Sequence, residues 1–473
     1  MNKAILYIVS VSSLLAACGG TDPAETVPLI VERTEGIKVY QSANTCEKCH
    51  EQHVNEWRIS NHAYAAKDPV YHAMTRMGQM QSNGKLGQFC IQCHSPVAFA
   101  NKSAPVYFDA EAGIYKQDTE NLGSEPGREA EGEGVTCDVC HSLVQVIEEV
   151  NARADYLPDN VKRGGIMDPV PTNAHESKFD DLQITSTGCG PCHAVTNPKG
   201  AKLEETFNEW EASSFNRPGG KTCQDCHMPE YKGKAASQGA VDDANIPERT
   251  LHRHVMPGVD VSLLPPEDFP GYEQLRTAVR ELLQETIEMS VMVDTSTKAI
   301  LVSMKNLAGH DVPSGATAER QMWLEVIVTS TSGAVVFESG TLDEDENLRV
   351  NNPLKTTRPG TDPQLVLYYQ QMYNDPKVSD PNSTAPAKKV NFPWQSNRRD
   401  NYLIAVDSTD VKKFDLSALD SGTYEATVRL RFRAFPPYFL KELEEKAGLD
   451  PRVRTEHLPT VDMEEATLES FDL

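Results

Sequence analysis

Five copies of the pattern Cys-x-x-Cys-His stand in the first half of this 473-residue chain. They occupy residues 46–50, 90–94, 137–141, 189–193 and 223–227. Two thiols at this spacing can form thioether bonds to the vinyl groups of a haem, and the histidine that follows is placed to ligate the iron. One copy could arise by chance, but five copies indicate five sites of covalent haem attachment.

The cysteine count leaves no motif cysteine for a disulfide or a free thiol. Ten of the 11 cysteines belong to the five motifs, and the remaining one, Cys18, lies near the N-terminus. A zinc ribbon needs two cysteine pairs per metal, and neither a ribbon nor a redox dithiol requires a histidine after every pair. We therefore predict five c-type haems on Cys46, Cys49, Cys90, Cys93, Cys137, Cys140, Cys189, Cys192, Cys223 and Cys226. The predicted proximal iron ligands are His50, His94, His141, His193 and His227.

The N-terminus has the pattern of an export signal. Lys3 precedes an apolar run, residues 4–15, that is too short to span a bilayer. The run ends in Leu-Ala-Ala-Cys-Gly, which is similar to a bacterial lipoprotein box, so we expect cleavage of residues 1–17 and lipidation of Cys18. An ordinary signal peptide with a coincidental cysteine is the alternative. Residues 18–40 have the polar composition of a tether. The sequence predicts an exported protein, anchored in the membrane only through Cys18, at the outer membrane and facing the periplasm or the cell surface.

The net charge argues against one class of partner. The chain has 45 basic and 69 acidic residues, for a formal charge of −24. Such a balance disfavours nucleic acid. It suits an electron carrier that meets redox partner proteins, either other cytochromes or a quinol-linked donor.

The chain changes character after the fifth motif, because no cysteine follows His227. We predict a mainly helical, loop-rich pentahaem domain over 41–285 that ends in a connector helix at 271–287. From 286 the apolar period changes to two, which predicts an immunoglobulin-like β-sandwich over 286–435. Its expected strands are 289–293, 299–304, 321–328, 335–337, 402–406 and 424–432, with a Pro- and Asn-rich excursion at about 350–400. Residues 436–473 should form a helix and an acidic tail. The predicted fold class is α+β multidomain.

The chain has 13 histidines, so eight lie outside the motifs: His53, His62, His72, His175, His252, His254, His310 and His457. A haem with two histidine ligands suits electron transfer, whereas a haem lacking one is open to substrate. His53 lies on the same helical face as His50 and cannot reach the opposite side of the same haem. His62 is rotated about 120° from His50 on a helix and should serve a different haem.

One segment recurs inside the chain. Residues 55–62, Asn-Glu-Trp-Arg-Ile-Ser-Asn-His, return as residues 208–215, Asn-Glu-Trp-Glu-Ala-Ser-Ser-Phe. Two helices of similar build could lie over haems, with Phe215 standing where the first copy has His62. The alternative is chance similarity between two amphipathic helices.

The run from Cys46 to Ala63, with Trp57, Ser60 and His62, resembles the first haem segment of the multihaem cytochrome c family. That family includes the tetrahaem cytochromes of ammonia oxidisers and, more distantly, hydroxylamine oxidoreductase. Further similar segments lie at 90–96, 134–137 and 220–229, and residues 306–315 resemble a motif of the β-domain appended to many such cytochromes.

The resemblance implies that His62, His175, His254 and His310 are distal iron ligands, the last donated by the β-domain. His252 is the favoured fifth ligand, ahead of His53 and His72, and His457 is expected at the surface. Because this chain has five motifs rather than eight, the activity of hydroxylamine oxidoreductase is not carried over.

Three functions remain open at this stage. The first is electron transfer through five haems, with no catalytic residue. The second is an oxidoreductase acting on a small nitrogen or sulfur compound at one open haem, which Phe215 would leave uncapped. The third is a structural or docking role, which could accompany the first.

Overall fold

The computed structural model describes residues 39–237, 246–264, 267, 269, 271–316, 318–349, 362–453 and 460–473. The predicted signal peptide, most of the tether with Cys18, and His457 lie outside these residues. Residues 37–473 form one compact unit. Among the described helices, none has the length and apolar character needed to cross a membrane.

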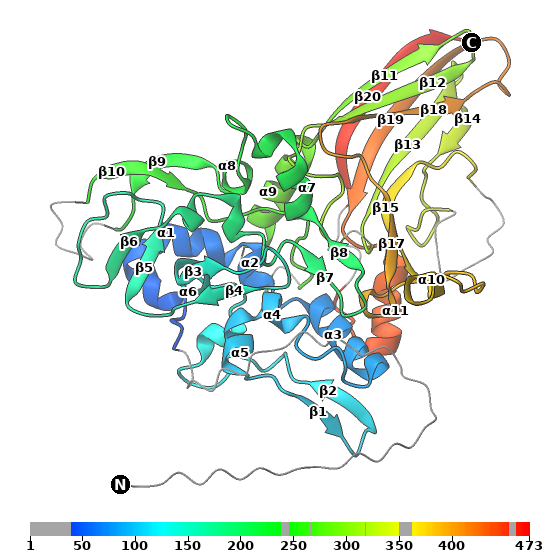
Figure 1. Cartoon of the computed structure of the whole chain (residues 1–473). Helices are drawn as coiled ribbons and strands as arrows, with labels where there is room; N and C mark the ends of the chain where they lie inside the picture. The colour runs from blue at the N-terminus through cyan, green and yellow to red at the C-terminus, as the bar shows by residue number, and fades with distance from the viewer. Residues whose placement is uncertain are drawn as a thin grey trace, which may run out of the picture. The chain divides into compact units, whose positions relative to one another are not determined.

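Four of the five haem motifs lie on helices (Figure 1). These helices are α1 (Asn44–Arg58), α4 (Ile91–His94), α6 (Cys137–His141) and α8 (Cys223–His227). The other helices of this region are α2 (Asn61–Tyr64), α3 (Pro69–Ser82), α5 (Pro96–Asn101) and α7 (Thr206–Ala212). Hydroxyl caps fix where the motif helices begin: Thr136 accepts a bond from the N–H of Val139 at α6, and Thr222 forms a capping box with Asp225 at α8. Helix α1 is interrupted at His50, whose φ and ψ of −116° and 39° turn the chain just after the first motif.

The region between the helices is less helical than predicted. It contains five two-stranded pairs among its described residues. They are β1 (Val106–Asp109) with β2 (Ile114–Gln117), β3 (Leu143–Val146) with β4 (Ala154–Tyr156), β5 (Val161–Gly164) with β6 (Glu176–Phe179), β7 (Val195–Thr196) with β8 (Lys202–Glu204), and β9 (Glu230–Lys234) with β10 (Glu248–His252). Segments this short cannot present an apolar helical stripe, but paired strands satisfy their backbone groups.

Helix α9 (Tyr272–Gln284) is the predicted connector. It buries Tyr272, Leu275, Val279 and Leu283 on one face, at the spacing of an amphipathic helix. Long strands follow it.

Two antiparallel sheets form the region after α9. One contains β11 (Ile287–Asp294), β12 (Ala299–Asn306) and β18 (Thr409–Asp415). The other contains β13 (Gln321–Ser330), β14 (Val335–Ser339), β15 (Leu367–Asn374), β16 (Lys388–Val390), β17 (Arg398–Tyr402), β19 (Thr423–Arg433) and β20 (Val461–Asp472). Ile300 and Val302 of the first sheet share one core with Val326 and Leu430 of the second, so apolar faces of both sheets are buried together. The chain is therefore α+β, while immunoglobulin-like topology stays a prediction.

This region differs from the prediction in four places. Strand β18 lies where no strand was expected. Residues 402–406 are not a strand: β17 ends at Tyr402, and Ile404 makes only an isolated bridge with Val312. The expected excursion at about 350–400 holds β15, β16, β17 and the short helix α10 (Pro376–Ser379) in its described part. After helix α11 (Pro437–Ala447), the expected acidic tail is instead strand β20.

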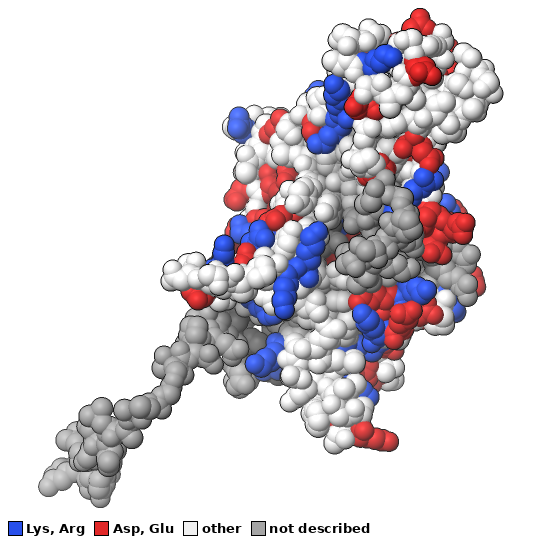
Figure 2. All heavy atoms as spheres, turned by 90° about the vertical axis from the view of Figure 1, so that its right-hand side faces the viewer, with Lys and Arg blue, Asp and Glu red and all other residues white. Residues whose placement is uncertain are grey.

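Strand β20 is acidic because its partner is basic. Arg429 of β19 contacts Glu465 at 2.6 Å, and Arg431 contacts Asp462 at 2.8 Å. Such cross-strand pairs of opposite charge favour pairing. Figure 2 shows a face on which Lys and Arg are interspersed with Asp and Glu, so the net negative charge is not gathered there into one acidic field.

Candidate haem sites

Four of the five motif histidines lie opposite another histidine ring. The distances between ring centroids are 6.2 Å for His50 and His175, 6.5 Å for His141 and His254, 6.2 Å for His193 and His62, and 6.4 Å for His227 and His310. The two members of each pair lie far apart in the sequence. The structure therefore brings all four histidines implied by the resemblance to one motif histidine each.

These separations fit an iron between the rings. A metal–nitrogen bond of about 2.0 Å, with the ring centre about 1.2 Å behind the nitrogen, places two axial imidazoles about 6.4 Å apart. Three pairs have nearly parallel planes, at 27°, 24° and 17°, whereas His62 and His193 are tilted by 55°.

Each motif histidine also has an acceptor behind its ring. For four of the five rings the atom facing Nδ1 is a backbone carbonyl oxygen: that of Ala235 for His50 (2.7 Å), Ala65 for His94 (3.2 Å), Arg163 for His141 (2.5 Å) and Pro257 for His227 (2.7 Å). For His193 it is the Glu204 carboxylate, at 3.2 Å. An acceptor at Nδ1 fixes the tautomer that leaves the Nε2 lone pair for a metal. The five rings are therefore oriented as ligands.

The opposite histidines are held in the same way. Carbonyl oxygens face Nδ1 of His175, His254 and His310 at 3.1, 2.9 and 2.9 Å. The exception is His62, whose Nδ1 lies 3.1 Å from the thioether sulfur of Met256. Burial, with the nearby His193 and His227, lowers the pKa of His62 to about 4, which favours its neutral ring.

Glu204 is a contact that the sequence does not predict. Its carboxylate, at the end of β8, faces His193 with a side chain that is 18% exposed. Burial alone would lower the pKa of His193, but the hydrogen bond and charge of Glu204 raise it to about 9. No spacing rule connects an acidic residue eleven positions after a motif histidine with that ring, so no sequence signal was available.

His252 and His53 are not placed as distal ligands. His252 pairs with Glu230 in the β9–β10 hairpin, and its Nδ1 lies 2.6 Å from the carbonyl of Met228. Its ring does not stand opposite any motif histidine in the described part of the chain. His53 lies 6.2 Å from His50, as helical neighbours do, but its Nε2 is hydrogen-bonded to the Tyr231 hydroxyl at 2.9 Å and its ring meets the edge of His254. The favoured fifth ligand, His252, is thus not brought to an iron site.

The motif histidine without a histidine opposite is His94. Among the described residues its ring partner is Tyr71 of α3, stacked parallel at 4.5 Å. Planes at that distance overlap face to face, so Tyr71 lies beside the imidazole and not across an iron from it. The neighbouring His72 directs Nδ1 to the Thr119 hydroxyl at 2.8 Å, and burial, with the charges of Arg76 and His94, lowers its pKa to about 4. His72 is therefore near His94, but its ring contact is with Tyr71 at 5.0 Å. The ring with no histidine opposite is therefore not at the motif beside Phe215, where the sequence placed the open haem.

Contacts between thiols show which motifs adjoin. The thiols of Cys46 and Cys137 lie close enough to shift each other's pKa, and so do those of Cys93 and Cys192 and those of Cys189 and Cys223. These contacts join the first motif to the third, the second to the fourth, and the fourth to the fifth. Cys140 of the third motif is also close enough to Cys192 to feel its charge. The fourth motif therefore adjoins three others and is the junction of the set.

The internal repeat has a structural basis. The indole of Trp57 donates to the carbonyl of Val135, and that of Trp210 donates to Lys221, each at 2.8 Å and each two residues before a motif. A Cβ at Gly134 would stand 2.1 Å from the His62 carbonyl, and one at Gly220 would stand 2.0 Å from that of Phe215. Both copies thus pack a tryptophan and a chain reversal against the start of a haem motif, and chance similarity does not explain these matched contacts.

In the second copy Phe215 is next to the loop that carries His310. A Cβ at Gly309 would meet Trp210 at 3.3 Å and Phe215 at 3.5 Å, so the loop lies directly on this copy. Glu209 of α7 accepts bonds from the Ser314 hydroxyl at 2.6 Å and the N–H of Asp311 at 3.2 Å. The second copy has Phe215 where the first has His62. His227 nevertheless has a histidine ring opposite it, because the β-region supplies His310.

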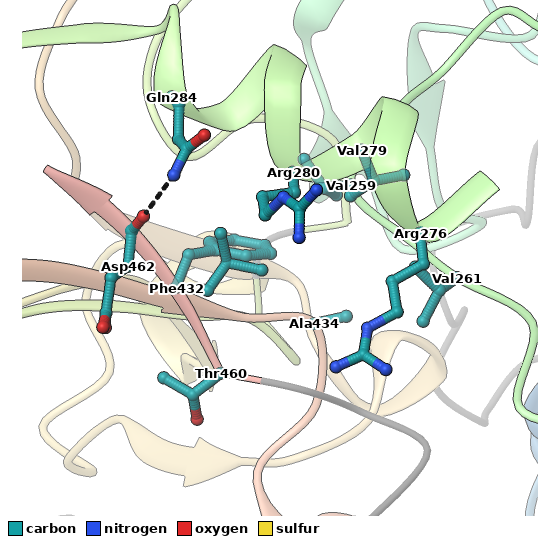
Figure 3. Close-up of a pocket in the computed structure, with 11 residues that line it drawn as sticks. Val259, Val261, Arg276, Val279, Arg280, Gln284, Phe432, Ala434, Thr460 and Asp462 are labelled. Carbon is teal, nitrogen blue, oxygen red and sulfur yellow. Dashed lines mark hydrogen bonds between the residues drawn. The ribbon is translucent and has the colours of Figure 1, made fainter. Parts of the chain in front are cut away.

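Figure 3 shows a surface pocket of about 290 Å³ between α9 and the strands β19 and β20. Arg276 and Arg280 point into it from the helix, and Gln284 donates to the carbonyl of Asp462 at 3.2 Å. No histidine or cysteine lines this pocket. It is separate from the histidine pairs.

Comparisons with known proteins agree with this geometry. Residues 45–142, which hold three of the five motifs, match the family described as cytochrome c554 and c-prime. The structure is similar to a penta-heme cytochrome c552 from Thermochromatium tepidum over 92% of this chain and 100% of that one, with a TM-score of 0.60 and 19% sequence identity. The findings support a multihaem cytochrome c. A comparison with curated proteins finds no match.

The family match covers residues 45–142 only, and at 19% identity the structural likeness shows a shared fold. The more distant relation to hydroxylamine oxidoreductase stays a prediction from the sequence.

Proposed function

We propose that the protein holds five c-type haems and conducts electrons among them, with four irons ligated by two histidines and the iron at His94 by one. The observation that carries the proposal is the set of four histidine pairs at 6.2–6.5 Å. Covalently fixed, six-coordinate haems change oxidation state without exchanging ligands, which is what an electron carrier needs. The thiol contacts support a path from the first motif through the third to the fourth, with branches to the second and fifth.

The haem and spin count tests this proposal. We expect five haems per chain by pyridine haemochrome assay, four low-spin and one high-spin by electron paramagnetic resonance. The reduced protein should bind one carbon monoxide per chain, because one iron has a free axial position. Fewer than four low-spin haems would overturn the electron-carrier assignment.

A fully low-spin spectrum without carbon monoxide binding would instead remove only the open site. His457, which lies outside the described residues, provides the control: His457→Ala should leave all spectra unchanged.

The second candidate function is chemistry at the iron of His94. We propose it because the described residues place no histidine opposite that ring. A small nitrogen or sulfur compound could then ligate this iron while the paired haems supply or remove electrons. Turnover with nitrite, hydroxylamine or tetrathionate would support it, and inactivity with all three would leave electron transfer as the function.

We also propose that the protein is exported and anchored by a lipid on Cys18, where it meets redox partner proteins at the outer membrane. The support is the apolar run followed by the lipoprotein-box pattern. Cys18→Ser should move the protein from the membrane fraction to the soluble periplasmic or secreted fraction while its haem content is kept. A variant that stays with the membrane would contradict the lipid anchor.

A further inference from the structure

The acceptor behind His193 differs in kind from those behind the other motif histidines. Four of the five Nδ1 atoms face backbone carbonyls, which are neutral. His193 faces the Glu204 carboxylate at 3.2 Å. A charged acceptor bonds roughly twice as strongly as a neutral one.

A carboxylate behind an imidazole changes the metal on its other side. It draws the Nδ1–H proton toward itself, which makes Nε2 a more electron-donating ligand. A more donating ligand favours Fe(III) over Fe(II), and hydrogen bonding of this kind is one of the levers that set a haem's potential. The histidine opposite does not compensate, because a thioether, a weak acceptor, is the partner of His62.

The surroundings of Glu204 leave much of its charge directed at His193. Its side chain is mostly buried, which reduces solvent screening. The charge of Arg320 also acts on Glu204, but Arg320 is itself paired with Asp260 at 3.0 Å. The carboxylate thus has one hydrogen-bonded partner among the described side chains, the ring of His193.

The hydrogen bond between Glu204 and His193 matters because His193 belongs to the fourth haem motif, which adjoins three of the others. The cysteines of its motif adjoin those of the second and fifth motifs, and Cys192 adjoins Cys140 of the third. Electrons that pass between the branches must cross this point. A low potential there means that electrons cross the junction without accumulating on it.

We propose that Glu204 is a positioning residue that acts through His193 to give the junction haem the most negative midpoint potential of the four haems with paired histidines. This inference rests on the proposed function, since it requires haems on these motifs.

The test is a redox titration of the full haem-loaded protein, followed by optical and electron paramagnetic resonance spectra. His62→Ala first identifies the low-spin signal of the junction haem, because that signal alone should be lost. Glu204→Gln keeps the shape and an oxygen acceptor but removes the charge. We expect the identified signal to remain low-spin and its midpoint potential to move to a more positive value, with the other midpoints unchanged.

Two further variants serve as controls for the effect of the Glu204 charge. Glu204→Asp keeps the charge and should restore part of the lowered potential, while Glu211→Gln, an exposed neighbour on α7, should change nothing. Unshifted midpoints in Glu204→Gln, or conversion of the signal to high spin, would overturn the proposal, the latter by showing that Glu204 only holds the ring in place. Failure of the proposed function would instead be seen in the wild-type protein, as fewer than four low-spin haems.

Discussion

Replacing His310 with alanine should turn one of the four low-spin haems high-spin and raise carbon monoxide uptake by one per chain. His310 is the ring opposite His227, at 6.4 Å, and an alanine has no atom that can ligate iron. The surrounding loop rests on Trp210 and Phe215, which offer no replacement ligand. Electron paramagnetic resonance of the oxidised variant and carbon monoxide titration of the reduced one measure the change.

The same variant should loosen the attachment of the β-region, because one cross-region bond to the metal is lost. Limited proteolysis between α9 and β11 would report this as faster cleavage. His252→Ala is the matched control, since His252 also lies near the fifth motif but binds a carbonyl and faces no motif histidine. If His310→Ala kept four low-spin haems, the ligand role of His310 would be wrong.

Gly134→Ala should have a large effect for a substitution that adds one methyl group, because it combines backbone strain with a steric clash. The backbone at Gly134 has φ of +74°, which costs alanine about 1 kcal/mol, and the new Cβ would stand 2.1 Å from the His62 carbonyl oxygen. That oxygen already accepts a bond from the N–H of Val135 at 2.9 Å, so it cannot withdraw without losing the bond. We expect about 3 kcal/mol or more of lost stability and a high-spin conversion at the His193 site, measured by denaturant unfolding and by spin state.

Gly127→Ala separates the clash from the backbone strain. Gly127 has a similar φ of +82°, but nothing lies within 4 Å of its added Cβ. This variant should lose only about 1 kcal/mol and keep its spectrum. Equal losses in the two variants would show that the close approach to His62 does not matter.

The sequence predicts the proximal half of the site because each motif is local. Ligand and thiols lie within five residues, and hydroxyl caps such as Thr136 and Thr222 mark where the motif helices begin. The pairing of distal histidines is different, because partners are separated by roughly 80 to 130 residues. Nothing local in His175 or His254 specifies its partner, so their pairing required the structure.

Two further features were hidden for physical reasons. Glu204 is an ordinary acidic residue until the β7–β8 hairpin turns it toward His193. Strand β20 was expected as a tail because its sequence is acidic, and only pairing with the arginines of β19 makes those charges favourable in a sheet. The connector helix and most long strands were predictable, since their apolar spacing is regular over eight or more residues.

His227 differs from the other paired motif histidines in where its partner comes from. Three of the histidine pairs lie within residues 50–254, whereas the fourth joins the fifth motif to His310 of the β-region, whose loop contacts α7. If the irons are bound as proposed, the spin state of the haem at His227 would report whether the β-region is docked, because only that haem takes a ligand from it.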